Sequence, residues 1–184
     1  MLLDNYSKWL NNALSPVCYG SRAQGWDLVL RVKAEDVVRV LMFLQSSSGS
    51  SFKVLSDLAV IDRPSSKNRF SLVYNLLSLK YQCRIFLRLT LSEGAGVPSA
   101  VPVFAGADWM EREAWDLFGV FFIGHPDLRR ILTDYGFSGH PLRKDFPLTG
   151  YFESCYDSGV RRVVYEPVEL AQEFRVFSFP ASWK

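Results

Sequence analysis

The stretch EREAWDLFG, residues 111–119, concentrates the side chains of this chain that could carry out acid–base chemistry. Three carboxylates, Glu111, Glu113 and Asp116, surround one guanidinium, Arg112. Glu111 and Glu113 are two residues apart, so on a helix they point in different directions and do not face one substrate. Glu113 and Asp116 are neighbours on a helix, but with Arg112 beside them an ion-pair network is the simpler interpretation. Catalysis by this group is the less favoured hypothesis.

The histidines and cysteines give little support for a bound metal or cofactor. His125 and His140 are the only histidines, and each is followed by a proline that fixes the chain. No spacing typical of a zinc site accompanies them, so Gly-His-Pro is better interpreted as a turn whose ring hydrogen-bonds the backbone. The three cysteines are far apart and too few for an iron–sulfur cluster or a complete disulfide framework. We therefore expect no cofactor in this chain and a reducing compartment.

Other functional classes are disfavoured by composition. The sequence has neither a phosphate-binding glycine loop nor a Gly-x-Ser-x-Gly nucleophile elbow. A net charge of +2 without a basic arm argues against nucleic-acid binding. Two basic pairs, Arg129/Arg130 and Arg143/Lys144, each lie near an aspartate. They suit salt bridges to a partner protein better than contacts with a phosphate backbone.

The carboxylates must be positioned by a short helix, which the sequence predicts over residues 108–118. Asp108 and Glu111 have the spacing of a capping box at its start. Gly119 stands where a helix would end in the left-handed conformation. Arg112 and Asp116, four residues apart, can pair on the surface of such a helix.

The rings of this helix are too many for one buried stripe. Trp109, Trp115 and Phe118 point to different sides of so short an element. We therefore expect the helix to be covered on more than one side. The high aromatic content of the whole chain, 15%, similarly indicates that some ring surface meets a partner.

The remaining pattern predicts an α+β fold. An amphipathic helix is expected first, then an alternating strand, a second helix and three β-rich segments that most simply form an antiparallel meander: residues 2–14, 26–33, 34–45, 52–62, 69–79 and 81–91. The predicted domain is mainly antiparallel sheet with flanking helices and covers residues 1–120. A long extended C-terminal arm, residues 121–184, follows it and is expected to pack on partner subunits.

The end of the arm is rich in rings: Phe174, Phe177, Phe179 and Trp183. Burying them does not offset the conformational entropy lost in ordering the segment, so this part of the arm needs a groove supplied by another subunit. No run approaches the length of apolar residues that spans a membrane. The N-terminal residues are neither a secretory signal nor an Arg- and Ser-rich presequence.

The motif around the predicted helix has a known counterpart. Glu111-Arg112-Glu113, two residues, Asp116-Leu117-Phe118, six residues, then His125, Arg129 and Ile131-Leu132 resembles the defining motif of the 30-kDa subunit family of respiratory complex I. The resemblance continues through LRRILTDYGFSGHPLRKDFPLTGY and covers roughly residues 106–180. It is strongest toward the mitochondrial and purple-bacterial branch.

The resemblance implies a core subunit of the peripheral arm of the proton-pumping NADH:ubiquinone oxidoreductase. Such a subunit docks on the 49-kDa subunit near the quinone-reduction region, carries no cofactor and is not catalytic alone, while FMN and iron–sulfur clusters lie in partner subunits. It implies a location on the matrix side of the mitochondrial inner membrane, reached only through the complex. The residues expected at partner interfaces are Glu111, Arg112, Glu113, Trp115, Asp116, Phe118, His125, Arg129, Arg130, Arg143, Lys144, Phe174, Phe177, Phe179 and Trp183.

Two alternatives stay open at this point. A related subunit of a membrane-bound hydrogenase would keep the fold and change the machine. A free-standing hydrolase would use Glu113, Asp116 and His125, and its activity would reside in a monomer.

Overall fold

The computed structural model describes residues 2–15, 17–24 and 27–177. Its contacts divide the chain into two units, Met1–Phe146 and Pro147–Lys184. Residues 121–146, which the sequence assigned to the arm, make their contacts within the first unit. Among the described residues, no helix is both long and apolar enough to cross a membrane.

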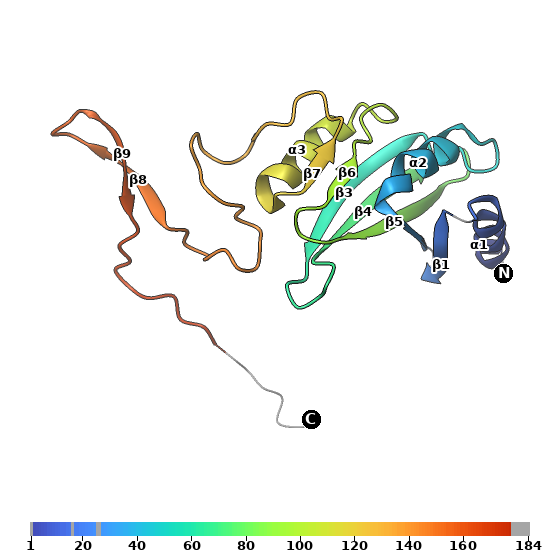
Figure 1. The fold of residues 1–184 in the computed structure, drawn as a ribbon, viewed down its shortest axis with the longest axis horizontal. Helices are drawn as coiled ribbons and strands as arrows, with labels where there is room; N and C mark the ends of the chain where they lie inside the picture. The colour runs from blue at the N-terminus through green and yellow to red at the C-terminus, as the bar shows by residue number, and fades with distance from the viewer. Residues whose placement is uncertain (1, 16, 25–26, 178–184) are drawn as a thin grey trace, which may run out of the picture. The chain divides into compact units, whose positions relative to one another are not determined.

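The first unit is built on a five-stranded sheet with the order β1-β2-β5-β4-β3 (Figure 1). Its strands are Cys18–Gln24 (β1), Asp27–Val32 (β2), Val54–Asp62 (β3), Phe70–Ser78 (β4) and Cys83–Leu91 (β5). The antiparallel meander β3-β4-β5 confirms the predicted α+β class. Two features differ from the expectation: β1 was not predicted, because CYGSRAQ lacks apolar alternation, and β2 pairs with β5 in parallel, so the sheet is mixed.

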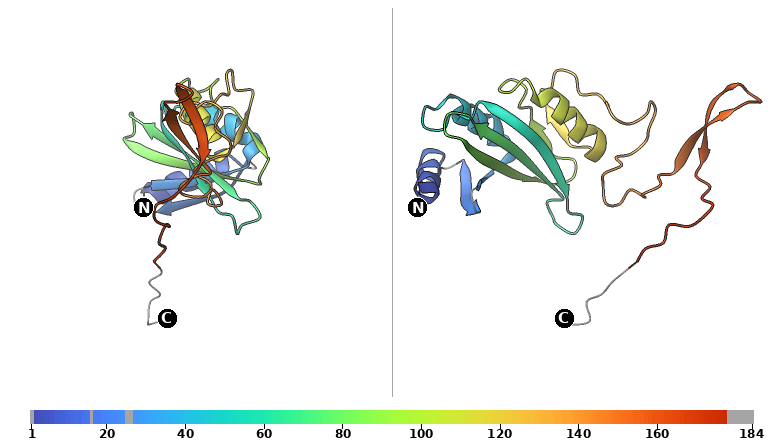
Figure 2. Two further views of the ribbon diagram at one scale, coloured as in Figure 1. Left: turned by 90° about the vertical axis from the view of Figure 1, so that its left-hand side faces the viewer. Right: turned by 180° about the vertical axis from the view of Figure 1, so that it is seen from behind.

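Helices and a second small sheet complete the first unit. The elements are α1 (Leu2–Ala13), a 3-10 turn η1 (Ala34–Asp36), α2 (Val37–Ser46), α3 (Ala107–Phe118) and the parallel strands β6 (Gly96–Pro98) and β7 (Phe121–Ile123). In Figure 1, α2 lies in front of the sheet, and the reverse view in Figure 2 shows the strands from their other side. The sheet therefore has one face covered by α2 and one face that α2 leaves open.

The core lies between the sheet and α2. Alternate residues of β4 and β5, such as Leu72, Leu76 and Leu87, have no exposed surface, and neither do Val40 and Leu44 of α2. Apolar residues recur every second position in the strands and about every 3.6 positions in the helix, so both elements present an apolar face to this layer. Burying such side chains contributes roughly 1.5–3 kcal/mol each.

The alternation predicted for β2 is confirmed where the structure describes it. Leu28, Leu30 and Val32 are buried. Trp26, which the sequence placed on the same stripe, lies outside the described residues.

The described part of the second unit contains an antiparallel hairpin, formed by β8 (Phe152–Asp157) and β9 (Arg162–Pro167). Its register places Phe152 opposite Pro167 and Tyr156 opposite Val163, so these side chains share one face with Tyr165. Most side chains of the hairpin are exposed.

The chain beyond the hairpin forms no helix or strand over residues 168–177. Phe174 and Phe177 are exposed there. Phe179 and Trp183, the other two rings predicted to need a groove, lie outside the described residues.

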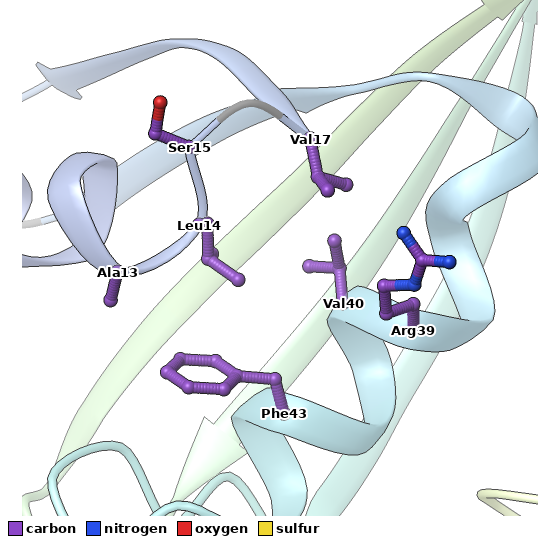
Figure 3. Close-up of a pocket in the computed structure, with 7 residues that line it drawn as sticks. All are labelled: Ala13, Leu14, Ser15, Val17, Arg39, Val40 and Phe43. Atoms are coloured by element: carbon purple, nitrogen blue, oxygen red, sulfur yellow. The ribbon is translucent and has the colours of Figure 1, made fainter.

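A small apolar hollow lies between the end of α1 and α2 (Figure 3). It has a volume of about 240 Å³ and is lined by Ala13, Leu14, Ser15, Val17, Arg39, Val40 and Phe43. The guanidinium of Arg39 is largely exposed and pairs with Asp36 on the same helical turn. The hollow has too few convergent polar groups to orient a ligand, so we do not consider it a functional site.

Candidate functional site

Helix α3 and the segment of residues 124–146 that follows β7 form the candidate site, because they contain the motif singled out by the sequence. The helix begins one residue earlier than predicted, after Gly106, and no side chain caps it. The predicted capping box of Asp108 and Glu111 is therefore wrong. Glu111 cannot reach back to the start of the helix because its carboxylate is bound elsewhere.

Glu111 is anchored in the core beneath α3. Its side chain has no exposed surface, and its oxygens accept hydrogen bonds of 2.6 Å from the Ser99 hydroxyl and from the backbone N–H of Ala100. Burial raises the pKa of Glu111, and these two hydrogen bonds offset only part of that rise. Glu111 therefore ties α3 to the turn that follows β6.

His125 lies beside this carboxylate. Its Nδ1 accepts a hydrogen bond from the backbone N–H of Asp127, which leaves the proton on Nε2. Nε2 is 3.3 Å from both the carbonyl and the carboxylate of Asp108, and 3.8 Å from Glu111. The ring thus closes the turn after β7 onto the first turns of α3, which agrees with the structural interpretation of Gly-His-Pro.

Substitution of Glu111 should separate its hydrogen-bonding role from its charge. Glu111→Ala should lower the free energy of unfolding by about 3 kcal/mol, because it leaves a cavity and two buried donors unpaired. Glu111→Gln should cost about 1 kcal/mol or less at pH 7, since its amide can accept from Ala100 and donate to Ser99. The measurement is urea unfolding of each variant followed by circular dichroism.

The pH dependence provides the check on this interpretation. An acid whose pKa is raised on folding makes the folded state bind protons more tightly, so wild type should gain stability relative to Glu111→Gln as the pH falls through that raised pKa. A pH-independent difference between the two proteins would contradict the assignment.

Asp116 organises the segment after β7 from the other end of the helix. Its side chain has no exposed surface. One carboxylate oxygen, Oδ2, accepts hydrogen bonds from the backbone N–H groups of Ile131, Leu132 and Thr133 at 3.2, 2.7 and 2.9 Å. The other, Oδ1, accepts from the Thr133 hydroxyl at 2.7 Å and from Arg130 at 3.2 Å.

The protonation of Asp116 follows from these contacts. Burial alone would raise the pKa of this carboxyl, but the hydrogen bonds from Thr133, Leu132 and Ile131 outweigh burial and hold the pKa below its usual range. The pairing of Arg112 with Asp116 expected from their spacing is not the arrangement found. Arg112 instead donates from Nε to the carbonyl of Arg129 at 3.3 Å and lies over the Trp109 ring.

The second Gly-His-Pro segment caps the C-terminus of α3. His140 Nδ1 bonds the carbonyl of Asp116 at 2.9 Å, and Arg143 Nε donates to the carbonyl of Phe118 at 2.6 Å. Between them, the backbone N–H of Leu142 donates a hydrogen bond to the carbonyl of Leu117 at 3.1 Å. Burial lowers the pKa of His140, and nearby Arg143 and Arg130 lower it further. Carbonyls that a helix end leaves unpaired are thus bonded by residues 140–143.

Gly119 makes this close approach possible. It ends α3 in the left-handed conformation, with φ of 76°, as the sequence predicted. A Cβ atom at this position would lie 2.5 Å from Arg143 Nη2 and 2.6 Å from His140 Nε2. The position therefore requires glycine for its backbone and for the space beside it.

An ion-pair network fixes the end of the segment to the sheet. Arg69 bonds Asp62 at 2.8 Å, and it also bonds Asp145 and Glu93. Arg143 pairs with the same Glu93 at 2.8 Å. The Arg69 hydrogen bond lowers the pKa of Asp62 despite burial. This network was not predicted from the sequence, although one signal was available: Asp62 is an acid at a core position of an alternating strand.

The predicted interface residues that the structure describes fall into four groups. The first group is Glu111 and Asp116, for which the predicted interface role is wrong. Both are buried, bind this chain's own groups and present no surface to a partner. The second group is Arg130 and Arg143, whose guanidinium groups form hydrogen bonds and ion pairs within the chain, as described above. The third group is exposed and consists of Glu113, Arg129, Lys144, Phe174 and Phe177. The fourth group is not exposed: Arg112 is buried, and Trp115, Phe118 and His125 are not exposed either.

The structure also exposes apolar residues that were not among the predicted interface residues. Trp109 on α3, Phe121 and Ile123 on β7, Leu132, and Tyr135 at 96% exposure all project from the α3 region. For Phe121 and Ile123 the available signal was alternation in β7, where Phe122 is buried between these two exposed neighbours.

The geometry gives no support to a hydrolytic group made of Glu113, Asp116 and His125. His125 contacts the first turns of α3, whereas Asp116 contacts residues 130–133 at the last turn. Both oxygens of Asp116 are engaged by hydrogen bonds, and Glu113 is exposed. Within the described part of the chain, no three acidic, histidine or cysteine side chains gather closely enough to hold a metal ion.

Comparison with known proteins decides the family. The family described as "Respiratory-chain NADH dehydrogenase, 30 Kd subunit" matches residues 30–152, which include strands β3, β4 and β5, helix α3 and the segment around it. The chain belongs to this family. Its membership in the 30-kDa subunit family makes it a subunit of a respiratory enzyme complex, as the resemblance indicated.

Individual relatives of this 30-kDa family chain agree. A subunit of the NADH-quinone oxidoreductase of Rhizobium johnstonii is 49% identical over 99% of this chain and 91% of its own length. The NADH-ubiquinone oxidoreductase subunit 9 of Reclinomonas americana is 52% identical over 86% of this chain and 78% of its own length.

A solved structure shares the fold of the 30-kDa family chain. It is a chain of the membrane-bound sulfane sulfur reductase, an archaeal respiratory membrane complex, with a TM-score of 0.69 and 23% identity over 80% of this chain and 87% of that chain. At this identity the likeness concerns the fold alone.

Proposed function

We propose that this chain is a docking subunit of the peripheral arm of the proton-pumping NADH:ubiquinone oxidoreductase. In this proposal it binds the 49-kDa subunit near the quinone-reduction region and carries no cofactor, while FMN and iron–sulfur clusters belong to its partners. The observation that carries the proposal is the internal use of the motif's charges. Glu111, Asp116, Arg130 and Arg143 bind this chain, and the exposed groups around them include several rings and aliphatic side chains.

The exposed apolar groups around α3 have the composition of a protein interface. Trp109 is 65% exposed and rests on the guanidinium of Arg112, which is itself held by the carbonyl of Arg129. Phe121 packs edge-on against Trp115 and still exposes half of its surface. Aromatic side chains held in fixed positions bind a partner with little further loss of entropy, which is typical of interface anchors.

The β8–β9 hairpin supplies a second apolar surface. Phe152, Tyr156, Val163 and Tyr165 are exposed on one face of a two-stranded sheet. A two-stranded hairpin alone is marginally stable in water and gains stability when a partner covers its apolar face. Together with the 49-kDa subunit, other subunits of the peripheral arm are the proposed partners. The proposed location is the matrix side of the mitochondrial inner membrane, with contact to the membrane only through the complex.

Removal of residues 147–184 should separate folding from assembly. A chain ending at Phe146 should keep its circular dichroism spectrum and melting transition, because the core of the first unit lies before that residue. Its incorporation into the complex should fall about tenfold or more, since hot-spot contacts dominate binding. The measurement is native gel electrophoresis of gently solubilised membranes with an in-gel NADH oxidation stain.

Point substitutions in the hairpin provide the matched control. Tyr156→Ser with Val163→Ser removes a cross-strand pair from the apolar face, whereas Asp157→Ser with Arg162→Ser removes the adjacent pair on the opposite face. The first variant should lose incorporation and the second should retain it within twofold. Normal incorporation of the truncated chain would exclude the hairpin as a docking element. A large band without NADH oxidation would point to a hydrogenase-type complex, and a free single chain to another function.

A further inference from the structure

The face of the five-stranded sheet opposite α2 carries an unusual set of charges. The right view of Figure 2 shows the strands from this side, with α2 behind them. We call it the open sheet face, and its exposed or half-buried side chains include Arg31, Ala59, Ile61, Val73, Arg84, Phe86 and Arg88. Strand pairing places Arg31 directly opposite Arg88, and Arg88 opposite Val73. Arg63, which is also exposed, directly follows β3 at the edge of this face.

The structure describes no acidic partner for these arginines. Arg88 donates from Nε to the neutral hydroxyl of Ser71 at 2.9 Å. Among the side chains that the structure describes, no carboxylate forms an ion pair with Arg31, Arg63, Arg84 or Arg88. Burial lowers the pKa of Arg88, and the nearby charges of Arg63 and Arg31 lower it further, while Tyr19 acts weakly in the opposite direction. In the free chain, Arg88 is therefore repelled by both Arg31 and Arg63.

The acid on this face does not relieve the repulsion. Asp57 pairs in register with Asn75, and its carboxylate accepts a hydrogen bond from the backbone N–H of Leu58 at 2.8 Å. Like charges directly opposite each other on neighbouring strands destabilise a sheet. An arrangement that costs stability in the isolated chain is explained when a binding partner supplies the missing opposite charge.

The apolar residues between the arginines identify the kind of partner. Phe86 and Val73 lie on neighbouring strands, and Ile61 is 40% exposed at the edge strand. Arginine mixed with aromatic and aliphatic groups is the composition of a protein interface. A nucleic-acid surface would instead require a wide basic excess, and the net charge of +2 does not provide one.

We infer that the open sheet face binds an acidic segment of a partner protein. Its carboxylates pair with Arg31, Arg63 and Arg88, and its apolar side chains cover Val73 and Phe86. This inference goes beyond the proposed function, because the surface lies on β2, β3, β4 and β5 and involves neither α3 nor the second unit. Its failure would leave the docking role of those elements intact.

The test uses the purified full-length chain and a fluorescent 16-residue peptide that alternates glutamate with leucine and valine. Its counterpart replaces each glutamate with glutamine, and binding is measured by fluorescence anisotropy. The acidic peptide should bind at least tenfold more tightly than the neutral one, and added salt should weaken the binding. Arg31→Gln with Arg88→Gln should reduce the affinity about tenfold or more.

A matched variant and a stability measurement complete the design. Lys8→Gln with Arg39→Gln removes the same charge from exposed positions of α1 and α2, and it should change the affinity less than twofold. The Arg31/Arg88 variant should melt at the same temperature as wild type or higher, because it removes a repulsion. The inference is overturned if the two peptides bind equally, if both variants lose affinity alike, or if the Arg31/Arg88 variant melts at a lower temperature. Tighter binding of a uridine oligonucleotide or of phosphatidylserine vesicles would also overturn it.

Discussion

Asp116→Ala is expected to lower the free energy of unfolding by about 3–4 kcal/mol, close to the largest effect of any single substitution in the α3 region. The substitution removes the common acceptor of three backbone N–H groups, at Ile131, Leu132 and Thr133, and the partner of Arg130. Each donor left unpaired in a site without water costs about 1–3 kcal/mol, and part of this cost is avoided when the loop opens to solvent. The melting temperature should fall by about 6–12 °C.

Two other variants show whether the loss belongs to this carboxylate. Glu113→Ala removes an exposed carboxylate from the same helix and should change stability by about 0.5 kcal/mol or less. Asp116→Asn keeps one acceptor oxygen and should fall between wild type and Asp116→Ala. Equal stability of Asp116→Ala and Glu113→Ala, measured by thermal and urea unfolding, would refute the structural role of Asp116.

The pH dependence has a definite sign. Because folding lowers the pKa of Asp116, its contribution to stability is fully present above the unfolded-state pKa of about 3.9 and is lost as the pH falls through the folded-state value. The difference between wild type and Asp116→Ala should therefore be constant near neutral pH and shrink in acid. Glu111 titrates in the opposite sense, so the two carboxylates of one helix can be distinguished by pH alone.

Gly119→Ala should destabilise the chain by about 2–4 kcal/mol. The left-handed conformation costs a residue with a Cβ atom about 1 kcal/mol. The new methyl group would also meet the His140 ring, which its bond to the Asp116 carbonyl and its contact with Trp115 hold in place. Moving the ring and Arg143 aside breaks the bonds that satisfy the end of α3.

Gly124 and Gly136 are matched controls for this substitution. Both have positive φ, 78° and 74°, and a Cβ atom added at either position meets nothing within 4 Å. Alanine at these positions should cost only the backbone term, about 1 kcal/mol. Thermal unfolding of the three variants compares them directly. If Gly119→Ala is no worse than the controls, the close packing of residues 140–143 on the helix end has little energetic value.

The elements that could be predicted from the sequence are those with strong periodicity. The antiparallel meander, α2 and α3 each carry a clear pattern of apolar residues, and the predicted ends of α3 differ from the structure by one residue at the start and none at the end. Strand β1 contains glycine and polar residues, and β6 has only three residues inside a Gly/Pro loop. Their formation depends on neighbouring strands, which a local pattern does not contain.

The chemistry of the α3 region was harder to predict than its location. Spacing paired Asp116 with Arg112, but the carboxylate found better donors in the backbone 15–17 residues ahead, since backbone N–H groups that leave water must be bonded. The capping box failed for the same reason, because Ser99 and Ala100 bind Glu111 from another part of the chain. Local spacing therefore identified the important residues and misassigned their partners.

The segment of residues 124–146 takes its shape from groups that precede it in the chain. It contains neither helix nor strand, and Asp116, the carbonyls at the end of α3, and the acids of the sheet hold it. During synthesis on a ribosome, the sheet and α3 emerge first. The groups that bind residues 124–146 are therefore already present when this segment emerges. The order of synthesis thus matches the order in which the parts of the fold depend on one another. Residues 124–146 do not have to adopt their conformation before the groups that stabilise it have been made.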